Sequence, residues 1–351
     1  MLFYSPIAWL LLLCFVVQTA LYFTNIYEHF VQEMVSYGNT YRCSEYIFVH
    51  GYGAQGLWFQ VQGFLYFYIP LLTMGVVSKE FSSGSVKLLY SSPVSNAQII
   101  LGKFLGMVIF AAIMMAVLLC YVLFAAFTVK DFELAWVLTG LLGLFLLACT
   151  YMAVGIFVSS LTTYQIIAAV GTFVVLMLLS MISGWGQEYD VIRDITYWFG
   201  INGRASTFIL GMICSEDVLY FPVLVAVFLA LTIIRLNAVR QKQRFTVTLG
   251  KNMAVIFLAC IVAYLSSRPI LIKYYDTTST QQNTLTPVSQ KILSQVKGGM
   301  TITSYVNVLD PRFWSYTYPG FIMENREQFR QYSRFKPVSY THLTLPTTPY
   351  V

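Results

Sequence analysis

Long apolar runs separated by short polar stretches are the main feature of the sequence. A helix that crosses a bilayer needs about 20 apolar residues. Charge-free runs of roughly this length predict membrane spans at about 6–27, 57–77, 104–127, 134–158, 165–185 and 218–234. A weaker run, Met253 to Leu265, predicts a seventh span. One short apolar run would also fit a buried core helix, but six such runs indicate a membrane protein.

The composition agrees with this prediction and excludes several other classes. Hydrophobic residues make up 58% of the 351 residues and charged residues only 10%, whereas soluble domains have about 25% charged residues. So few charges cannot cover a water-exposed surface. Soluble enzymes, nucleic-acid-binding proteins and disordered proteins are therefore excluded. We expect an all-α polytopic membrane protein that contacts the lipid bilayer and binds no nucleic acid.

The distribution of basic residues predicts the orientation in the membrane. If the N-terminus is cytoplasmic, the inner loops hold one acid, Glu80, and eight basic residues: Lys79, Lys87, Lys103, Arg235, Arg240, Lys242, Arg244 and Lys251. The outer loops hold four basic residues, Arg42, Lys130, Arg193 and Arg204, and ten acids. Lys and Arg favour the cytoplasmic side. We therefore predict a cytoplasmic N-terminus and an extracytoplasmic location for residues after about 268.

The loop between the second and third predicted spans has the most specific pattern. Residues 82–85 are expected to end a helix, with Gly84 supplying a permissive backbone conformation. Pro93 ends a short amphipathic segment, and Ser95 is a suitable N-cap for the next helix. These residues predict a short helix at the membrane surface. An ordinary interfacial loop would also form such a helix.

This loop resembles the signature of ABC-2 type exporter permeases, in which a coupling helix rests on an ATPase subunit. The resemblance covers about residues 1–240 and implies a six-helix permease domain that forms a dimer. The positions that it assigns to the ATPase-coupling loop are Glu80, Gly84, Lys87, Leu88, Leu89, Ser92, Pro93, Val94, Gly102 and Lys103. The family usually has an amphipathic helix before the first span, so we expect the natural chain to begin before Met1.

After residue 240 the chain resembles a second kind of protein. Residues 241–267 are predicted to form a basic linker and the seventh transmembrane helix. Thr286 and Pro287 predict the start of a helix, and residues 300–308 predict a strand. This order is similar to the extracytoplasmic subunit of gliding-motility (Gld-type) ABC systems. The whole chain thus resembles a GldF-like permease fused to the start of a GldG-like subunit, although any periplasmic α/β domain could begin in this way.

The last residues do not fit this pattern. Residues 338–351 are expected not to continue the α/β order, because Ser339 to Thr348 resembles translated sequencing-adapter read-through. We therefore expect a non-native tail. The extracytoplasmic domain at 268–337 is then truncated, because about 70 residues are too few to close a core of this kind.

No catalytic or metal site is expected. The sequences after Gly102 and Gly250 lack the spacing of a P-loop, so ATP and Mg²⁺ are expected to bind to a partner ATP-binding subunit and no cofactor is expected in this chain. The histidines show no metal-ligand spacing. Ser159 and Ser160 are expected to take part in helix packing or to bond backward within their own helix.

Two cysteines form a candidate disulfide. Cys43 and Cys214 both fall on the predicted outer side, where an oxidising periplasm would permit a bond. The distance between them does not follow from the sequence.

Two functions fit these observations. The first is a permease subunit of an ATP-driven ABC-2 exporter in the bacterial inner membrane. A separate ATPase subunit would hydrolyse the ATP, and a gliding-motility-like role follows only from the resemblance. The second is a non-transport membrane scaffold or sensor that displays the extracytoplasmic domain. A bundle of six spans is more than an anchor needs, which favours the permease.

Overall fold

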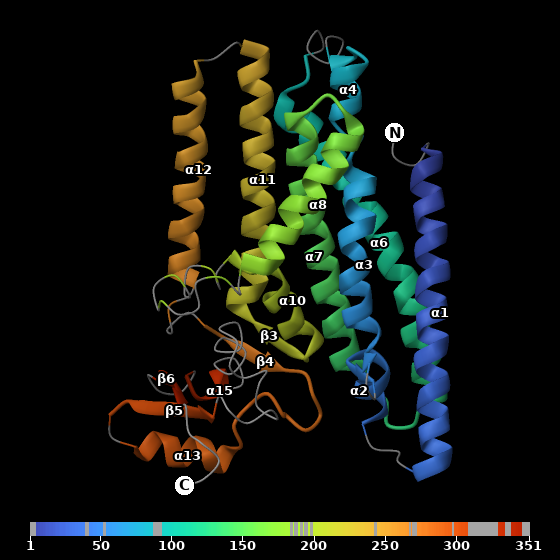
Figure 1. Cartoon of the computed structure of the whole chain (residues 1–351), viewed down its shortest axis with the longest axis vertical. Coiled ribbons are helices and arrows are strands. Elements are labelled where there is room, and N and C mark those ends of the chain that lie inside the picture. Colours follow the sequence, from blue (N-terminus) through green and yellow to red (C-terminus); the bar gives the residue numbers. More distant parts are fainter. Residues whose placement is uncertain are drawn as a thin grey trace. The chain divides into compact units, whose positions relative to one another are not determined.

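The computed structural model (Figure 1) places most of the chain in two compact units. One unit comprises residues 1–177 and 204–277, and the other comprises residues 178–203 and 278–351. The residues that the structure describes are 5–38, 42–51, 54–86, 93–182, 185, 189, 192, 196, 199–241, 244–266, 268, 272–296, 298–307, 329–333 and 338–345.

Long apolar helices dominate the described residues. They are α1 (Pro6–Tyr37), α3 (Leu57–Thr73), α6 (Asn96–Thr128), α7 (Leu134–Leu161), α8 (Gln165–Met181), α11 (Ser215–Gln241) and α12 (Phe245–Ser266). Among the described residues, six helical segments are long and apolar enough to cross a membrane, and the second of them, Leu57–Ser82, includes both α3 and the short helix that follows it. α8 has only 17 residues. The prediction of an all-α polytopic membrane protein is confirmed.

Shorter elements connect these helices in the first unit. They are α2 (Cys43–Phe48), the hairpin strands β1 (His50–Gly51) and β2 (Ala54–Gln55), α4 (Ser78–Ser82), α10 (Ile201–Ile209), and the antiparallel strands β3 (Met212–Cys214) and β4 (Tyr274–Asp276). α10 begins in the second unit and continues into the first. β4 follows α12 in the chain and pairs with the strand that directly precedes α11.

The core of the first unit is built around α7. This helix packs against α3, α6 and α11, and 72% of its most apolar window is buried. Small residues allow the close approach: a Cβ atom on Gly155 would lie 2.2 Å from Oγ1 of Thr73 on α3. Small residues of this kind are typical of packed membrane helices. By contrast, none of the corresponding window of α12 is buried, so its side chains are available to lipid.

A capping box begins α6. The Ser95 hydroxyl accepts a hydrogen bond from the Gln98 N–H at 3.2 Å, and Oε1 of Gln98 accepts one from the Ser95 N–H at 3.0 Å. The predicted N-cap role of Ser95 is therefore confirmed. The paired bonds satisfy two backbone donors that the helix itself cannot satisfy.

This cap leads to a first prediction. We expect Ser95→Ala to lower the free energy of unfolding by about 1 kcal/mol, because the exposed first turn of α6 loses its acceptor. The measurement is a reversible denaturation of the purified protein in mixed micelles. Ser95→Asp keeps an acceptor at the cap and serves as the control. An equal loss in both variants would show that the cap does not stabilise the helix.

Several helix boundaries differ from those predicted from the sequence. α1 continues past residue 27 to Tyr37 because Phe30 is buried against Tyr46 of α2, with ring centres 5.7 Å apart. Its 32 residues span about 48 Å, more than the bilayer core of about 30 Å. α3 ends at Thr73 and not at residue 77. The predicted basic linker is largely helical, since α11 reaches Gln241 and α12 begins at Phe245.

The second unit contains a small α/β arrangement. Its elements are α13 (Pro287–Gln295), β5 (Met300–Asn307), α15 (Arg330–Ser333) and β6 (Val338–Leu345). Thr286 caps α13, since its hydroxyl accepts from the Ser289 N–H at 3.3 Å. The predicted helix start and the predicted strand are thus confirmed. The sequence also predicts a helix over residues 324–332, and only residues 329–332 of it lie within the described residues.

The expectation that residues after 337 do not continue this pattern is wrong. β6 pairs with β5 in parallel, from Met300 opposite Val338 to Asn307 opposite Leu345. The physical reason is local composition, since Val338, Tyr340 and Thr341 have high strand propensity. A parallel pair needs a long crossover, which the chain between the two strands provides.

Candidate functional site

The loop between α3 and α6 starts at a break in the helical backbone. α3 ends at Thr73, residues 74–77 are not helical, and α4 begins at Ser78. Gly75 and the β-branched Val76 and Val77 have low helix propensity, which favours a break here. A break exposes backbone N–H and C=O groups that then need partners from elsewhere.

A serine of α7 supplies several of these partners. Oγ of Ser159 accepts hydrogen bonds from the N–H groups of Val77 at 3.2 Å and Ser78 at 3.1 Å. The same hydroxyl donates to the carbonyl oxygen of Met74 at 3.0 Å. Ser159 is fully buried, so these bonds form away from solvent. The serine therefore joins the root of the loop to the central helix of the bundle.

A lysine of α6 reaches the same break. Nζ of Lys103 donates to the carbonyl oxygen of Val76 at 2.6 Å and forms an ion pair with Glu80 of α4. The two charged side chains are only 19% and 15% exposed. Glu80 and Lys103 are both residues of the predicted coupling loop, and the structure brings them together. Glu80 is therefore engaged within the chain.

The next part of the loop is open to solvent. α4 ends at Ser82, and Gly84 follows with a φ of +71°, which confirms its predicted role in ending the helix. A Cβ at Gly84 would meet no atom within 4 Å. Pro93 and Val94 are exposed where the chain returns toward α6, and Gly102 lies on an exposed part of that helix. The loop thus joins a braced root to an exposed outer part.

Four predicted residues of this loop, Lys87, Leu88, Leu89 and Ser92, lie outside the described residues. The amphipathic helix predicted before Pro93 also falls largely on that segment. Its presence stays a prediction.

The predicted inner loops meet at one end of the bundle. Figure 1 shows α4 at the same end as the last turn of α11 and the first turn of α12. Nδ2 of Asn96, at the start of α6, donates to Oδ1 of Asn237 near the end of α11 at 2.7 Å. Gln165, which opens α8, lies beside Gly75 in the helix break. Hydrogen bonds at this end thus join α6 to α11 and α7 to the helix break.

Sequence reasoning did not identify Ser159 as part of this site. Ser160 follows the prediction made for both serines, because its hydroxyl bonds backward to the carbonyl oxygen of Phe157 at 2.6 Å. Ser159 bonds across to the break after α3 and to the start of α4, which agrees with the predicted part in helix packing. The sequence offered one signal for this role: Ser159 lies four residues after Gly155 and therefore on the same face of α7, the face that a small residue could bring close to another helix.

A second polar cluster lies where α10 meets α11. Nη1 of Arg204 donates to Oδ1 of Asp217 at 2.6 Å, and Nη2 donates to Oε1 of Glu216 at 3.0 Å. The guanidinium also lies 4.7 Å from the ring centre of Tyr220. The side chains of Arg204 and Asp217 are 1% and 0% exposed. Both acids lie in the first turn of α11, where the helix dipole favours negative charge.

This cluster was not predicted, because its three charges were assigned to outer loops. Trp136 of α7 also bonds to this region, since its Nε1 donates to the carbonyl oxygen of Ile209, the last residue of α10, at 2.9 Å. These hydrogen bonds join α10 to α11 and α7 to the end of α10, which indicates a structural role for this cluster.

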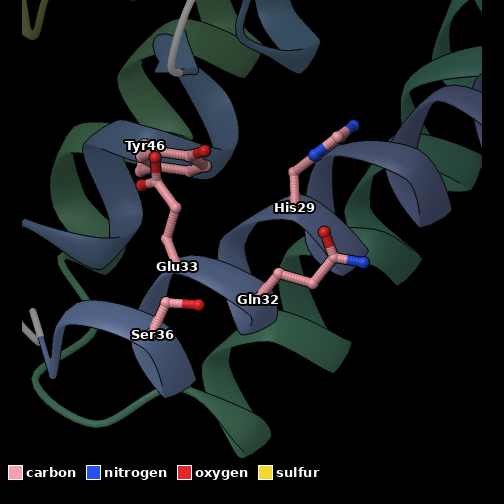
Figure 2. A pocket seen from close by; sticks show the side chains of 5 residues that line it. All are labelled: His29, Gln32, Glu33, Ser36 and Tyr46. Carbon is pink, nitrogen blue, oxygen red and sulfur yellow. The ribbon is translucent and has the colours of Figure 1, made fainter.

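A polar pocket of about 310 Å³ opens beside the last turns of α1. Figure 2 shows its lining side chains, which are His29, Gln32, Glu33 and Ser36 from α1 and Tyr46 from α2. His29 and Gln32 point away from Glu33 in this view. Among the residues that the structure describes, no group of three or more His, Cys, Asp or Glu could hold a metal ion. The pocket therefore offers no convergent set of ligands.

The two cysteines of the predicted disulfide lie on different elements. Cys43 begins α2 and Cys214 ends β3, and both are buried. Burial raises the pKa of the Cys43 thiol above its usual value, which disfavours the reactive thiolate. The pairing of Cys43 with Cys214 therefore stays a prediction.

Comparison with known families agrees with the architecture. The family model described as ABC-2 family transporter protein matches residues 1–191, which is more than half of the 351 residues. The match includes the braced loop between α3 and α6. No curated protein and no solved structure matches the chain significantly. The chain is therefore a multi-pass membrane protein that belongs to the ABC-2 transporter family, whose permeases work with an ATP-binding subunit.

Proposed function

We propose that the chain is the permease subunit of an ATP-driven exporter in the bacterial cytoplasmic membrane. A separate subunit binds ATP and Mg²⁺ and hydrolyses the ATP, while this chain is not itself an enzyme. The N-terminus and the loop between α3 and α6 face the cytoplasm. The excess of Lys and Arg in the loops at this end supports the orientation. Export as the direction is supported by the resemblance of the loop to exporter permeases.

The observation that carries this proposal is the braced root of the loop, residues 74–78, which Ser159 and Lys103 hold by hydrogen bonds. A segment that receives force from a partner must be exposed where the partner binds and held firmly where it joins the membrane helices. Gly84, Pro93 and Val94 are exposed, whereas Ser159 and Lys103 bond the break between α3 and α4. This arrangement suits a mechanical contact between an ATPase and the bundle.

The transporter is further proposed to contain two copies of the permease. Two bundles would enclose the substrate path between them, and closure of the ATPase subunits would open that path by moving the loops. The segment after α12 would lie outside the cytoplasm as the start of a Gld-type domain. Its helix and strand order, α13 followed by β5, supports this resemblance. A gliding-motility role is proposed on that resemblance alone.

Association with the ATP-binding subunit provides the test. We expect Gly84→Val to reduce recovery of that subunit about tenfold when the tagged permease is purified from membranes. Gly84 has a φ of +71°, and a β-branched residue there costs about 1–3 kcal/mol of strain, which distorts the docking surface. The measurement is the amount of ATP-binding subunit recovered per permease.

Gly38→Val is the matched control. Gly38 also has a positive φ, +63°, and also has open space around it, but it ends α1 far along the chain from the loop. We expect normal recovery of the ATP-binding subunit with this variant. If the wild-type permease recovers no such subunit, the scaffold or sensor function becomes the better description. If both variants lose it equally, the loop is not the docking surface.

A further inference from the structure

We propose that Ser159 is a positioning residue that couples movement of α4 to the central helix α7. The proposal rests on the proposed function, because α4 leads into the loop that is taken to receive the ATPase subunit. Three hydrogen bonds carry it: Ser159 bonds to Met74 and Val77, the first and last residues of the helix break, and to Ser78, which begins α4.

The break makes such a link necessary. Within a continuous helix, the backbone hydrogen bonds would transmit a movement of α4 directly along α3. Residues 74–77 interrupt that ladder, so α4 could tilt without moving the rest of α3. Ser159 replaces the missing backbone partners with a side chain from another helix. A tilt of α4 therefore acts on α7 unless these bonds break.

The packing around Ser159 favours transmission. Gly155 lies one turn earlier on the same face of α7, and the absence of a side chain there brings α3 and α7 into close contact at Thr73. α7 is also the helix that packs against α3, α6 and α11. Packed interfaces of this kind resist continuous deformation and shift between discrete arrangements. A displacement at Ser159 thus reaches the whole bundle.

Lys103 holds the same break to α6 through the carbonyl oxygen of Val76 and through Glu80. The two contacts differ in kind. Lys103 has a long, flexible side chain that can keep its contacts while its partners move, whereas the short side chain of Ser159 keeps its hydrogen bonds over only a small displacement. Ser159 is accordingly the residue whose loss should separate movement of α4 from movement of α7.

Hydrogen exchange of the complex with its ATP-binding subunit provides the test. The complex is placed in lipid nanodiscs, and exchange is measured by mass spectrometry with and without ATP, Mg²⁺ and vanadate. In Ser159→Ala without nucleotide, we expect exchange at Val77 and Ser78 to rise about tenfold, because both amides lose their acceptor. With nucleotide, we expect the change in α4 to persist and the change in α7 to fall by at least half.

Ser160→Ala is the matched control, since Ser160 is buried beside Ser159 but its hydroxyl bonds to Phe157 within its own helix. It should behave as the wild type in both readouts. Ser159→Thr keeps a hydroxyl and should restore the response of α7, which a loss of packing alone would not explain. If Ser159→Ala does not yield a folded complex, Ser159→Cys replaces it, because it keeps the volume and weakens the acceptor.

The outcomes separate the two proposals. A response of α7 in Ser159→Ala equal to that in Ser160→Ala overturns the role of Ser159 and leaves the proposed function intact. If the wild-type chain binds no ATP-binding subunit, or its loop does not respond to nucleotide, the proposed function fails and the role of Ser159 fails with it.

Discussion

Arg204→Ala is expected to lower the free energy of unfolding by about 3–5 kcal/mol, because it leaves two buried carboxylates without their cation. The guanidinium of Arg204 bonds to both Glu216 and Asp217, and the side chain of Asp217 is fully buried. The helix dipole at the start of α11 offsets only part of the uncompensated charge. Denaturation of the purified protein in mixed micelles measures the effect.

Arg42→Ala is the control for this experiment. Arg42 forms an ion pair with Glu45 at 3.3 Å, but its side chain is 41% exposed. Exposed pairs contribute about 0–1 kcal/mol, so this variant should remain close to the wild type. A loss in Arg204→Ala no larger than that in Arg42→Ala would contradict the structural role of the cluster.

A triple variant identifies the cause of the loss. Arg204→Met combined with Glu216→Gln and Asp217→Asn removes the charges together and keeps most of the volume. We expect it to recover more than half of the stability lost in Arg204→Ala, since buried pairs can often be replaced by neutral groups at little cost. No recovery would indicate that the contact of Arg204 with Tyr220, 4.7 Å from the ring centre, matters more than charge.

The second large effect is expected at the contact between α3 and α7. Gly155→Ala should lower the free energy of unfolding by about 1–3 kcal/mol, because the added methyl group overpacks a filled interface. Its Cβ would lie 2.2 Å from Oγ1 and 2.6 Å from Cβ of Thr73, so one helix must shift. The same denaturation assay measures the loss.

Gly63→Ala is the control, because Gly63 lies on α3 with no atom within 4 Å of its added Cβ. This variant should be neutral or slightly stabilising, as alanine favours the helix more than glycine does. Thr73→Ala in the Gly155→Ala background removes the nearest atom but not Cβ of residue 73. It should therefore restore only part of the stability. Equal behaviour of Gly155→Ala and Gly63→Ala would refute the close contact.

The spans could be predicted from the sequence because each is an apolar run without charge, which depends on local composition alone. The caps at Ser95 and Thr286 were predictable for a similar reason, since a cap involves residues three positions apart. Helix ends were less predictable. α1 passes residue 27 because Phe30 packs against α2, a contact between segments that the sequence does not place together.

The loop and the ion cluster differ in how much could be predicted. The sequence identified Glu80 and Lys103 as members of one loop, but not that they pair. It assigned Arg204, Glu216 and Asp217 to outer loops, whereas packing of α10 against α11 buries them. β3 was not predicted at all, because a strand of three residues is too short for a periodic pattern and depends on its partner.

The pairing of β3 with β4 limits the movement of α12 relative to α11. It joins the chain just before α11 to the chain just after α12, with Ser215 N–H donating to the carbonyl oxygen of Lys273 at 2.8 Å. The chain between Gln241 and Phe245 joins the other ends of the same two helices. α12 is thus linked to α11 twice, by the short connection after Gln241 and by the strand pair beyond its other end, although none of its apolar window is buried. The chain beyond Thr277 therefore begins directly after a strand that is hydrogen-bonded to the segment before α11.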